Sequence, residues 1–146
     1  GIGIAGFGAA AESAARDLAD GKWARIEKLR NILEKALEGS GKPLISVGAD
    51  MARLPNTSCF AAPGWKGETQ VMQMDLAGFA VSAGSACSSG KVKASRVLRA
   101  MGYDDDVASC AIRVSLGLET TEDEVEQFAT VWLAAYGRFL ARKAAR

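Results

Sequence analysis

Cys87 is the residue that the sequence places best to act as a nucleophile. It lies in the run Ser-Ala-Gly-Ser-Ala-Cys-Ser-Ser-Gly at 82–90, where every neighbouring side chain is small. We therefore expect a loop without regular structure and a sulfur atom that is more exposed than that of any other cysteine. Four cations follow closely and favour the reactive thiolate: Lys91, Lys93, Arg96 and Arg99. The alternative interpretation is a Gly/Ser loop with an incidental cysteine.

Arg113 is the second candidate. The run at 111–116 alternates, so Ile112, Val114 and Leu116 fall on one face of a strand and Arg113 and Ser115 on the other. A guanidinium group carried on a rigid strand suits bidentate binding of a carboxylate. An exposed strand arginine without a function is the alternative interpretation.

Most other familiar catalytic devices are excluded by composition. The chain contains no His, which removes the Ser-His-Asp triad, the Cys-His pair and the common zinc sites. The remaining cysteines, Cys59 and Cys110, form no CxxC pair and are expected to be small core residues. We therefore predict no metal site and no disulfide framework, and a reducing, cytoplasmic setting.

A GxGxxG pattern occurs at Gly1, Gly3 and Gly6, with Asp20 downstream. The dinucleotide-binding fingerprint requires a strand that delivers the first glycine to the start of a helix. No residue precedes Gly1 in this sequence, so we interpret the pattern as a Gly/Ala-rich helix start.

Length and charge describe one ordinary domain. The chain has 146 residues, of which 49% are hydrophobic, and 18 basic residues balance 17 acidic ones. This length and apolar fraction predict a single domain over residues 1–146 with its own core. The near-neutral charge argues against nucleic acid as a partner. The sequence contains no apolar run of membrane-spanning length and no basic start of a signal peptide.

Hydrophobic periodicity predicts several helices and short strands. Helices are expected over 3–18, 22–38, 67–78 and 95–101, and a long amphipathic helix follows the capping box at 121–124. The inner side of the 67–78 helix is expected to hold Val71, Met72 and Leu76. Strands are expected over 44–47, 57–61, 79–82 and 111–116. This order predicts an α+β fold, in which a small, mainly antiparallel sheet is packed on one side against helices.

Several of these motifs together resemble the pyridoxal-phosphate-dependent cysteine desulfurases of the class V aminotransferase group. The segment at 82–90 and the helix at 95–102 resemble that family's active-site loop and following helix. The segments at 112–117 and 120–125 resemble its next strand and last helix, and those at 54–58 and 67–76 also fit. Residues 3–12 resemble the helix that joins the family's large domain to its small one.

The resemblance implies an enzyme that takes sulfur from L-cysteine and releases alanine. Cys87 matches the nucleophile that becomes a persulfide, and Arg113 matches the arginine that binds the substrate carboxylate. The family acts as a homodimer and passes sulfur to an iron–sulfur scaffold or a sulfur-carrier protein. The resemblance thus implies that the chain is the C-terminal small domain of such an enzyme and is inactive alone.

The pyridoxal phosphate site of the family is not matched. The family holds the cofactor in its larger domain with a Lys that follows a His, a second His and an Asp, and this chain has no His. We therefore expect no cofactor-binding residue here. Two further interpretations remain open: a selenocysteine lyase or other class V enzyme of the same fold, and a stand-alone, non-catalytic interaction domain.

Overall fold

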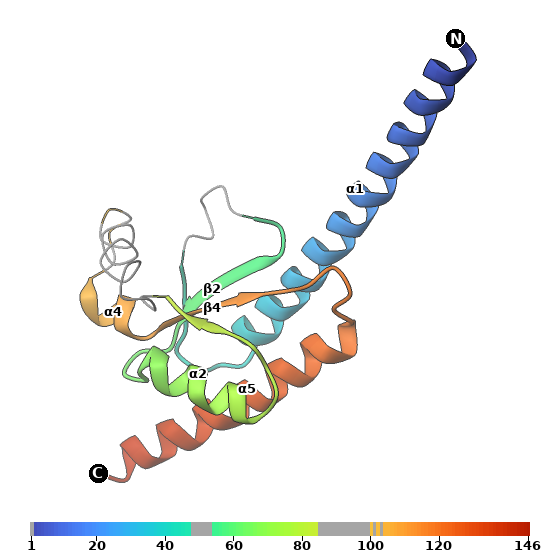
Figure 1. The fold of residues 1–146 in the computed structure, drawn as a ribbon. Coiled ribbons are helices and arrows are strands. Elements are labelled where there is room, and N and C mark those ends of the chain that lie inside the picture. The colour runs from blue at the N-terminus through green and yellow to red at the C-terminus, as the bar shows by residue number, and fades with distance from the viewer. Residues whose placement is uncertain (1, 48–53, 85–99, 101, 103) are drawn as a thin grey trace.

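The computed structural model describes residues 2–47, 54–84, 100, 102 and 104–146 (Figure 1). The helices are α1 (Ile2–Glu38), α2 (Gly67–Leu76), α4 (Asp105–Ser109) and α5 (Glu122–Ala144). The strands are β1 (Ile45–Ser46), β2 (Thr57–Ala61), β3 (Ser82–Ala83) and β4 (Ala111–Ser115). Within these residues, no helix is long and apolar enough to cross a membrane.

The strands form one antiparallel sheet in the order β1-β2-β4-β3. Its centre is the pair β2 and β4, in which Phe60 lies opposite Ile112 and Cys59 opposite Arg113. The two-residue strand β3 forms one edge and pairs through Ser82 and Ala83. The α+β fold with a small antiparallel sheet is therefore confirmed.

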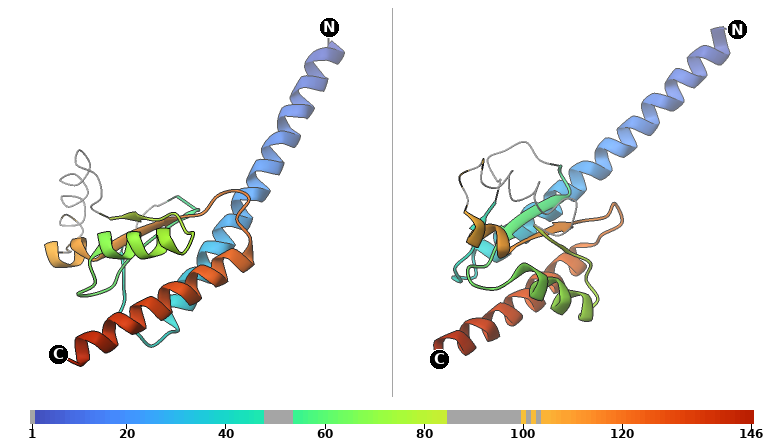
Figure 2. Two further views of the ribbon diagram at one scale, coloured as in Figure 1. Left: turned by 60° about the horizontal axis from the view of Figure 1, so that its bottom comes forward. Right: turned by 60° about the vertical axis from the view of Figure 1, so that its left-hand side comes forward.

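The main core lies between one face of this sheet and the helices. Figures 1 and 2 show the second half of α1 and most of α5 crossing the same side of the sheet. Apolar residues that recur at helical spacing fill the gap, with α1 contributing four buried side chains: Ile26, Leu29, Leu33 and Leu37. The sheet contributes Phe60, Ile112 and Val114, and α5 contributes Val125, Phe128, Trp132 and Tyr136.

A buried amide joins α2 to this core. The side chain of Gln70 is fully buried and donates hydrogen bonds to the carbonyl oxygens of Trp65 and Cys110, over 2.8 and 3.0 Å. Its oxygen accepts a hydrogen bond from the indole of Trp132 at 3.1 Å. Because each polar atom of the amide has a partner, burial of this side chain is tolerated.

The structure corrects the predicted inner side of the 67–78 helix. Gly67, Gln70 and Met74 are buried, whereas Met72 and Leu76 are exposed to 64% and 83%, and Val71 is half-buried. The apolar residues of this helix predicted the wrong buried face, because the three hydrogen bonds of Gln70 stabilise that polar side chain in the core. A Cβ atom at Gly67 would lie 2.7 Å from the carbonyl oxygen of Ala111, so only glycine permits this close packing.

The first helix also differs from its prediction. The two helices expected over 3–18 and 22–38 are one continuous helix, because an isolated glycine such as Gly21 costs a helix only about 1 kcal/mol. The helix projects beyond the sheet (Figure 1), and residues 12–25 are exposed. The helix is fixed near its middle to the loop before α5, where Arg25 donates hydrogen bonds of 2.8 Å to the carbonyl oxygens of Leu118 and Thr120.

The remaining elements follow their local signals. The capping box at Thr121 and Glu124 begins α5 as predicted. The short helix α4 was not predicted; its signal is Asp104, whose carboxylate accepts the backbone N–H of Val107. The strand expected over 79–82 is displaced to Ser82–Ala83. The predicted helix at 95–101 lies outside the described residues except for Ala100.

Candidate functional site

Arg113 lies on the face of the sheet opposite the main core. Along β4, Ile112 and Val114 are buried and face the helices, whereas Arg113 and Ser115 are exposed. This alternation confirms the prediction that a strand carries Arg113. The guanidinium group forms no hydrogen bond or ion pair with any other residue that the structure describes, so it is free to bind an anion from outside this part of the chain.

Two residues flank Arg113 in register. Cys59 lies opposite it on β2, and Ser82 lies opposite it on β3. Directly paired residues of antiparallel strands point to the same face, with Cβ atoms about 4.5–5.5 Å apart. This face of the sheet is buried at Ala61 and Ala111 and exposed at Arg113 and Ser115, and it is called the open face below. It has a row across three strands with one cation at its centre and a small side chain on each side.

The thiol of Cys59 loses its proton less readily in these surroundings than a free thiol. It is half-buried against a small cluster that includes Val47, Ala61 and Cys110. Burial raises the pKa of the Cys59 thiol, and the nearby positive charge of Arg113 offsets only part of this effect. Cys110 is 5% exposed, as expected of a small core residue. Sequence reasoning also placed Cys59 in the core and missed that it adjoins Arg113.

Cys87 itself lies outside the described residues, and so do the four cations that follow it. The chain that leads to it is described up to Gly84. There the backbone N–H donates a hydrogen bond of 2.8 Å to the carbonyl oxygen of Ala111, and a Cβ atom would lie 2.9 Å from the Cβ atom of Ala111. The described chain is therefore fixed against β4 at Ala111, two residues along the strand from Arg113.

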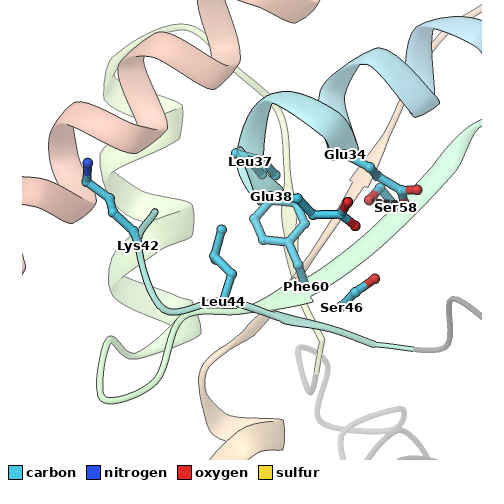
Figure 3. Close-up of a pocket in the computed structure, with 8 residues that line it drawn as sticks. All are labelled: Glu34, Leu37, Glu38, Lys42, Leu44, Ser46, Ser58 and Phe60. Atoms are coloured by element: carbon cyan, nitrogen blue, oxygen red, sulfur yellow. Dashed lines mark hydrogen bonds between the residues drawn. The ribbon is translucent and has the colours of Figure 1, made fainter. Parts of the chain in front are cut away.

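A hollow of about 270 Å³ lies on the other side of β2, between its helix-facing side chains and the end of α1 (Figure 3). Glu34, Glu38 and Ser46 line its polar part, and Lys42 points away from it. The hydroxyl group of Ser58, which is buried, donates a hydrogen bond of 2.6 Å to the carboxylate of Glu34. This hydrogen bond fastens β2 to α1, and the hollow lies on the opposite face of the sheet from Arg113.

The other chemistries considered from the sequence find no support in the described residues. Gly3 and Gly6 lie inside α1 rather than in a turn between a strand and a helix, so the dinucleotide fingerprint is absent there. Within the same residues, no group of three or more Cys, Asp or Glu side chains could hold a metal ion.

Comparison with known proteins places the chain in a family. Residues 2–128 match the family model of class-V aminotransferases. The chain is 40% identical over 129 residues to a cysteine desulfurase of Cereibacter sphaeroides, and 41% identical over 125 residues to the cysteine desulfurase IscS of Anaeromyxobacter sp. strain Fw109-5. These matches cover 88% and 85% of this chain.

A solved structure shares the fold. A NifS-like protein from Rickettsia africae ESF-5 superimposes with a TM-score of 0.66 at 30% identity, covering 79% of this chain and 29% of that protein. The chain spans about a third of the length of the curated relatives, 32% and 30% for the two named above. The match of nearly the whole chain to the family model leads to one conclusion: the chain belongs to the class-V aminotransferase family.

Proposed function

We propose that this chain is the small domain of a cysteine desulfurase, in which Cys87 receives sulfur from L-cysteine and Arg113 binds the substrate carboxylate. The observation that carries the proposal is the position of Arg113. Among the described residues its guanidinium group has no hydrogen-bond or ion-pair partner, and Ser82, which lies opposite it on β3, is five residues before Cys87.

Arg113 supplies a fixed anchor. Its strand lies inside the sheet between β2 and β3, so the backbone that carries the guanidinium group is held on both sides. A guanidinium group binds a carboxylate through two parallel hydrogen bonds, which fixes the direction of the substrate as well as its place. The carboxylate end of L-cysteine would therefore be held on β4, beside β3, the strand that leads towards Cys87.

Cys87 is the cysteine suited to the transfer. Cys110 is buried and burial raises the pKa of the Cys59 thiol, whereas a nucleophile must be a reachable thiolate. The thiolate attacks the substrate sulfur, an S–S bond forms, and the Cβ–S bond breaks. The electron pair of the broken bond, with a proton, yields alanine, and Cys87 retains the sulfur as a persulfide.

The number of residues between Gly84 and Cys87 suits two steps: accepting sulfur from the substrate and delivering it to an acceptor. Three residues span at most about 11 Å when fully extended. From the fixed amide of Gly84, Cys87 can therefore reach a substrate bound at the neighbouring strand and can also turn outwards by a similar distance. We propose that the outward position delivers sulfur to an iron–sulfur scaffold or a sulfur-carrier protein.

The residues of this chain do not fit a pyridoxal phosphate site, because the chain has no His to stack on the ring and none of its lysines follows one. We propose that residues outside this sequence hold the cofactor, in a large domain of a cytoplasmic homodimer. When bound, pyridoxal phosphate serves as an electron sink that weakens the bond to be broken.

The proposal is tested with the full-length protein. With L-cysteine and a reductant, we expect equal yields of alanine and sulfide. Cys87→Ser should abolish sulfide release while leaving the absorbance change on cysteine addition intact, because substrate binding does not need this thiol. Cys110→Ala is the matched control and should retain activity. Wild-type sulfide release by the Cys87 variant would overturn the assignment of the nucleophile.

A further inference from the structure

We propose that Ser82 is a second contact for the substrate carboxylate, with its hydroxyl group donating a hydrogen bond to the carboxylate that Arg113 holds. This inference rests on the proposed function and adds a specificity-determining residue to it. Ser82 and Arg113 are directly paired across β3 and β4, so both side chains lie on the open face at neighbouring positions.

A carboxylate group can accept more hydrogen bonds than one arginine donates to it. Its two oxygen atoms offer about four acceptor positions, and a bidentate guanidinium group fills two of them. A hydroxyl group beside the guanidinium can fill a third. Ser82 is half-buried, and its hydroxyl group forms no hydrogen bond with the rest of the described chain. It is therefore available as a donor.

The other neighbours of Arg113 are less suitable. Cys59, on the opposite side, is a weak donor. Ser115 and Thr57 share the open face, but they pair with each other one row away, and the hydroxyl group of Thr57 already donates to Asn56. Ala61 and Ala111, which form the row on the other side, have no donor in their side chains.

The position of Ser82 has a mechanical consequence. β3 has only two residues and forms an edge of the sheet, so few contacts hold it. A carboxylate bound between Arg113 and Ser82 would connect β3 to β4 through the substrate. Substrate binding would thus hold β3, the strand that leads to Cys87, more firmly against β4.

The test is steady-state kinetics of the full-length enzyme with L-cysteine. Loss of one hydrogen bond to a charged group should raise KM for Ser82→Ala by about ten-fold or more, with kcat at saturation nearly unchanged. Ser82→Thr keeps the hydroxyl group and should restore most of the affinity. Ser115→Ala, on the same face but one row away, is the matched control and should leave KM unchanged.

Arg113→Ala separates this inference from the proposed function. If Arg113→Ala raises KM and Ser82→Ala does not, the role of Ser82 is wrong and the carboxylate anchor stands. If neither variant changes KM, both assignments fail. An equal rise in KM for Ser82→Ala and Ser82→Thr would also overturn the inference. It would show that the shape of the side chain at this position, and not its hydroxyl group, determines substrate binding.

Discussion

The proposed role of Arg113 in binding the substrate carboxylate can be tested with two single substitutions. Arg113→Ala in the full-length enzyme should weaken the binding of L-cysteine by about 1.5–3 kcal/mol, the contribution of a charge-assisted hydrogen-bonded contact. Arg113→Lys keeps the charge but loses the planar pair of donors, so we expect it to recover only part of this loss. Binding is measured by titrating the cofactor absorbance with substrate. An alanine variant with wild-type affinity would contradict the anchor.

Cys59 and Tyr136 give the chain a dependence on alkaline pH. Burial raises the pKa of both groups above their ordinary values, with Cys110 adding to the effect at Tyr136. The folded chain therefore holds these protons at pH values where the unfolded chain has released them. By linkage, the free energy of unfolding falls as pH rises above the ordinary pKa of a thiol, about 8.5.

This fall can be measured by urea unfolding between neutral and alkaline pH. In Cys59→Ala, the decline between pH 8 and 10 should be shallower, because one of the two contributions is removed. Ser115→Ala, which removes no titratable group from the same face of the sheet, is the control and should leave the decline unchanged. A decline as steep in Cys59→Ala as in the original chain would contradict the raised pKa.

At the scale of elements, Gln70 links α2 to the core through three hydrogen bonds. Gln70→Leu should lower the free energy of unfolding by about 3 kcal/mol, because it leaves the carbonyl group of Trp65 and the indole N–H of Trp132 buried without their partner. The carbonyl group of Cys110 also loses one of its hydrogen bonds and keeps the one from the backbone N–H of Ala62. Gln73→Ala, on a less buried position of the same helix, is the control and should change stability by about 0.5 kcal/mol or less. Chemical denaturation measures both. Equal effects would contradict the role of the buried amide.

Two glycines in helices should respond to alanine in opposite ways. Gly67→Ala should destabilise the chain, since the added Cβ atom would meet the carbonyl oxygen of Ala111 and push α2 from β4. Gly21→Ala should increase helix content, because nothing lies within 4 Å of its Cβ position and alanine is the better helix former. Circular dichroism during thermal unfolding compares the two. A stabilised Gly67→Ala variant would show that the packing is looser than described.

The sequence predicted those elements whose periodicity agrees with their packing. β2, β4 and α5 begin where expected, because alternation and a capping box are strong local signals. α4 and β3 are too short to show a period, and the buried face of α2 depends on Gln70, whose partners are distant in sequence. The pairing of Cys59 and Ser82 with Arg113 could not be predicted, because strand register is set by tertiary contacts.

At the scale of the whole molecule, the proposal that residues outside this sequence hold the cofactor is testable. Pyridoxal phosphate added to these 146 residues should produce no stoichiometric Schiff-base absorbance that survives dialysis, because no lysine lies in a cofactor motif. The full-length protein is the positive control and should retain the band. A stable one-to-one adduct on this chain would contradict the proposal that the cofactor is held elsewhere.

The central claim is that Cys87 carries the transferred sulfur. After a single turnover of the full-length enzyme with L-cysteine labelled at sulfur, the protein is alkylated, digested and analysed by mass spectrometry. We predict that the peptide containing Cys87 alone gains one labelled sulfur atom, and that the peptides with Cys59 and Cys110 gain none. Labelled sulfur on Cys59 or Cys110, with none on Cys87, would contradict the account.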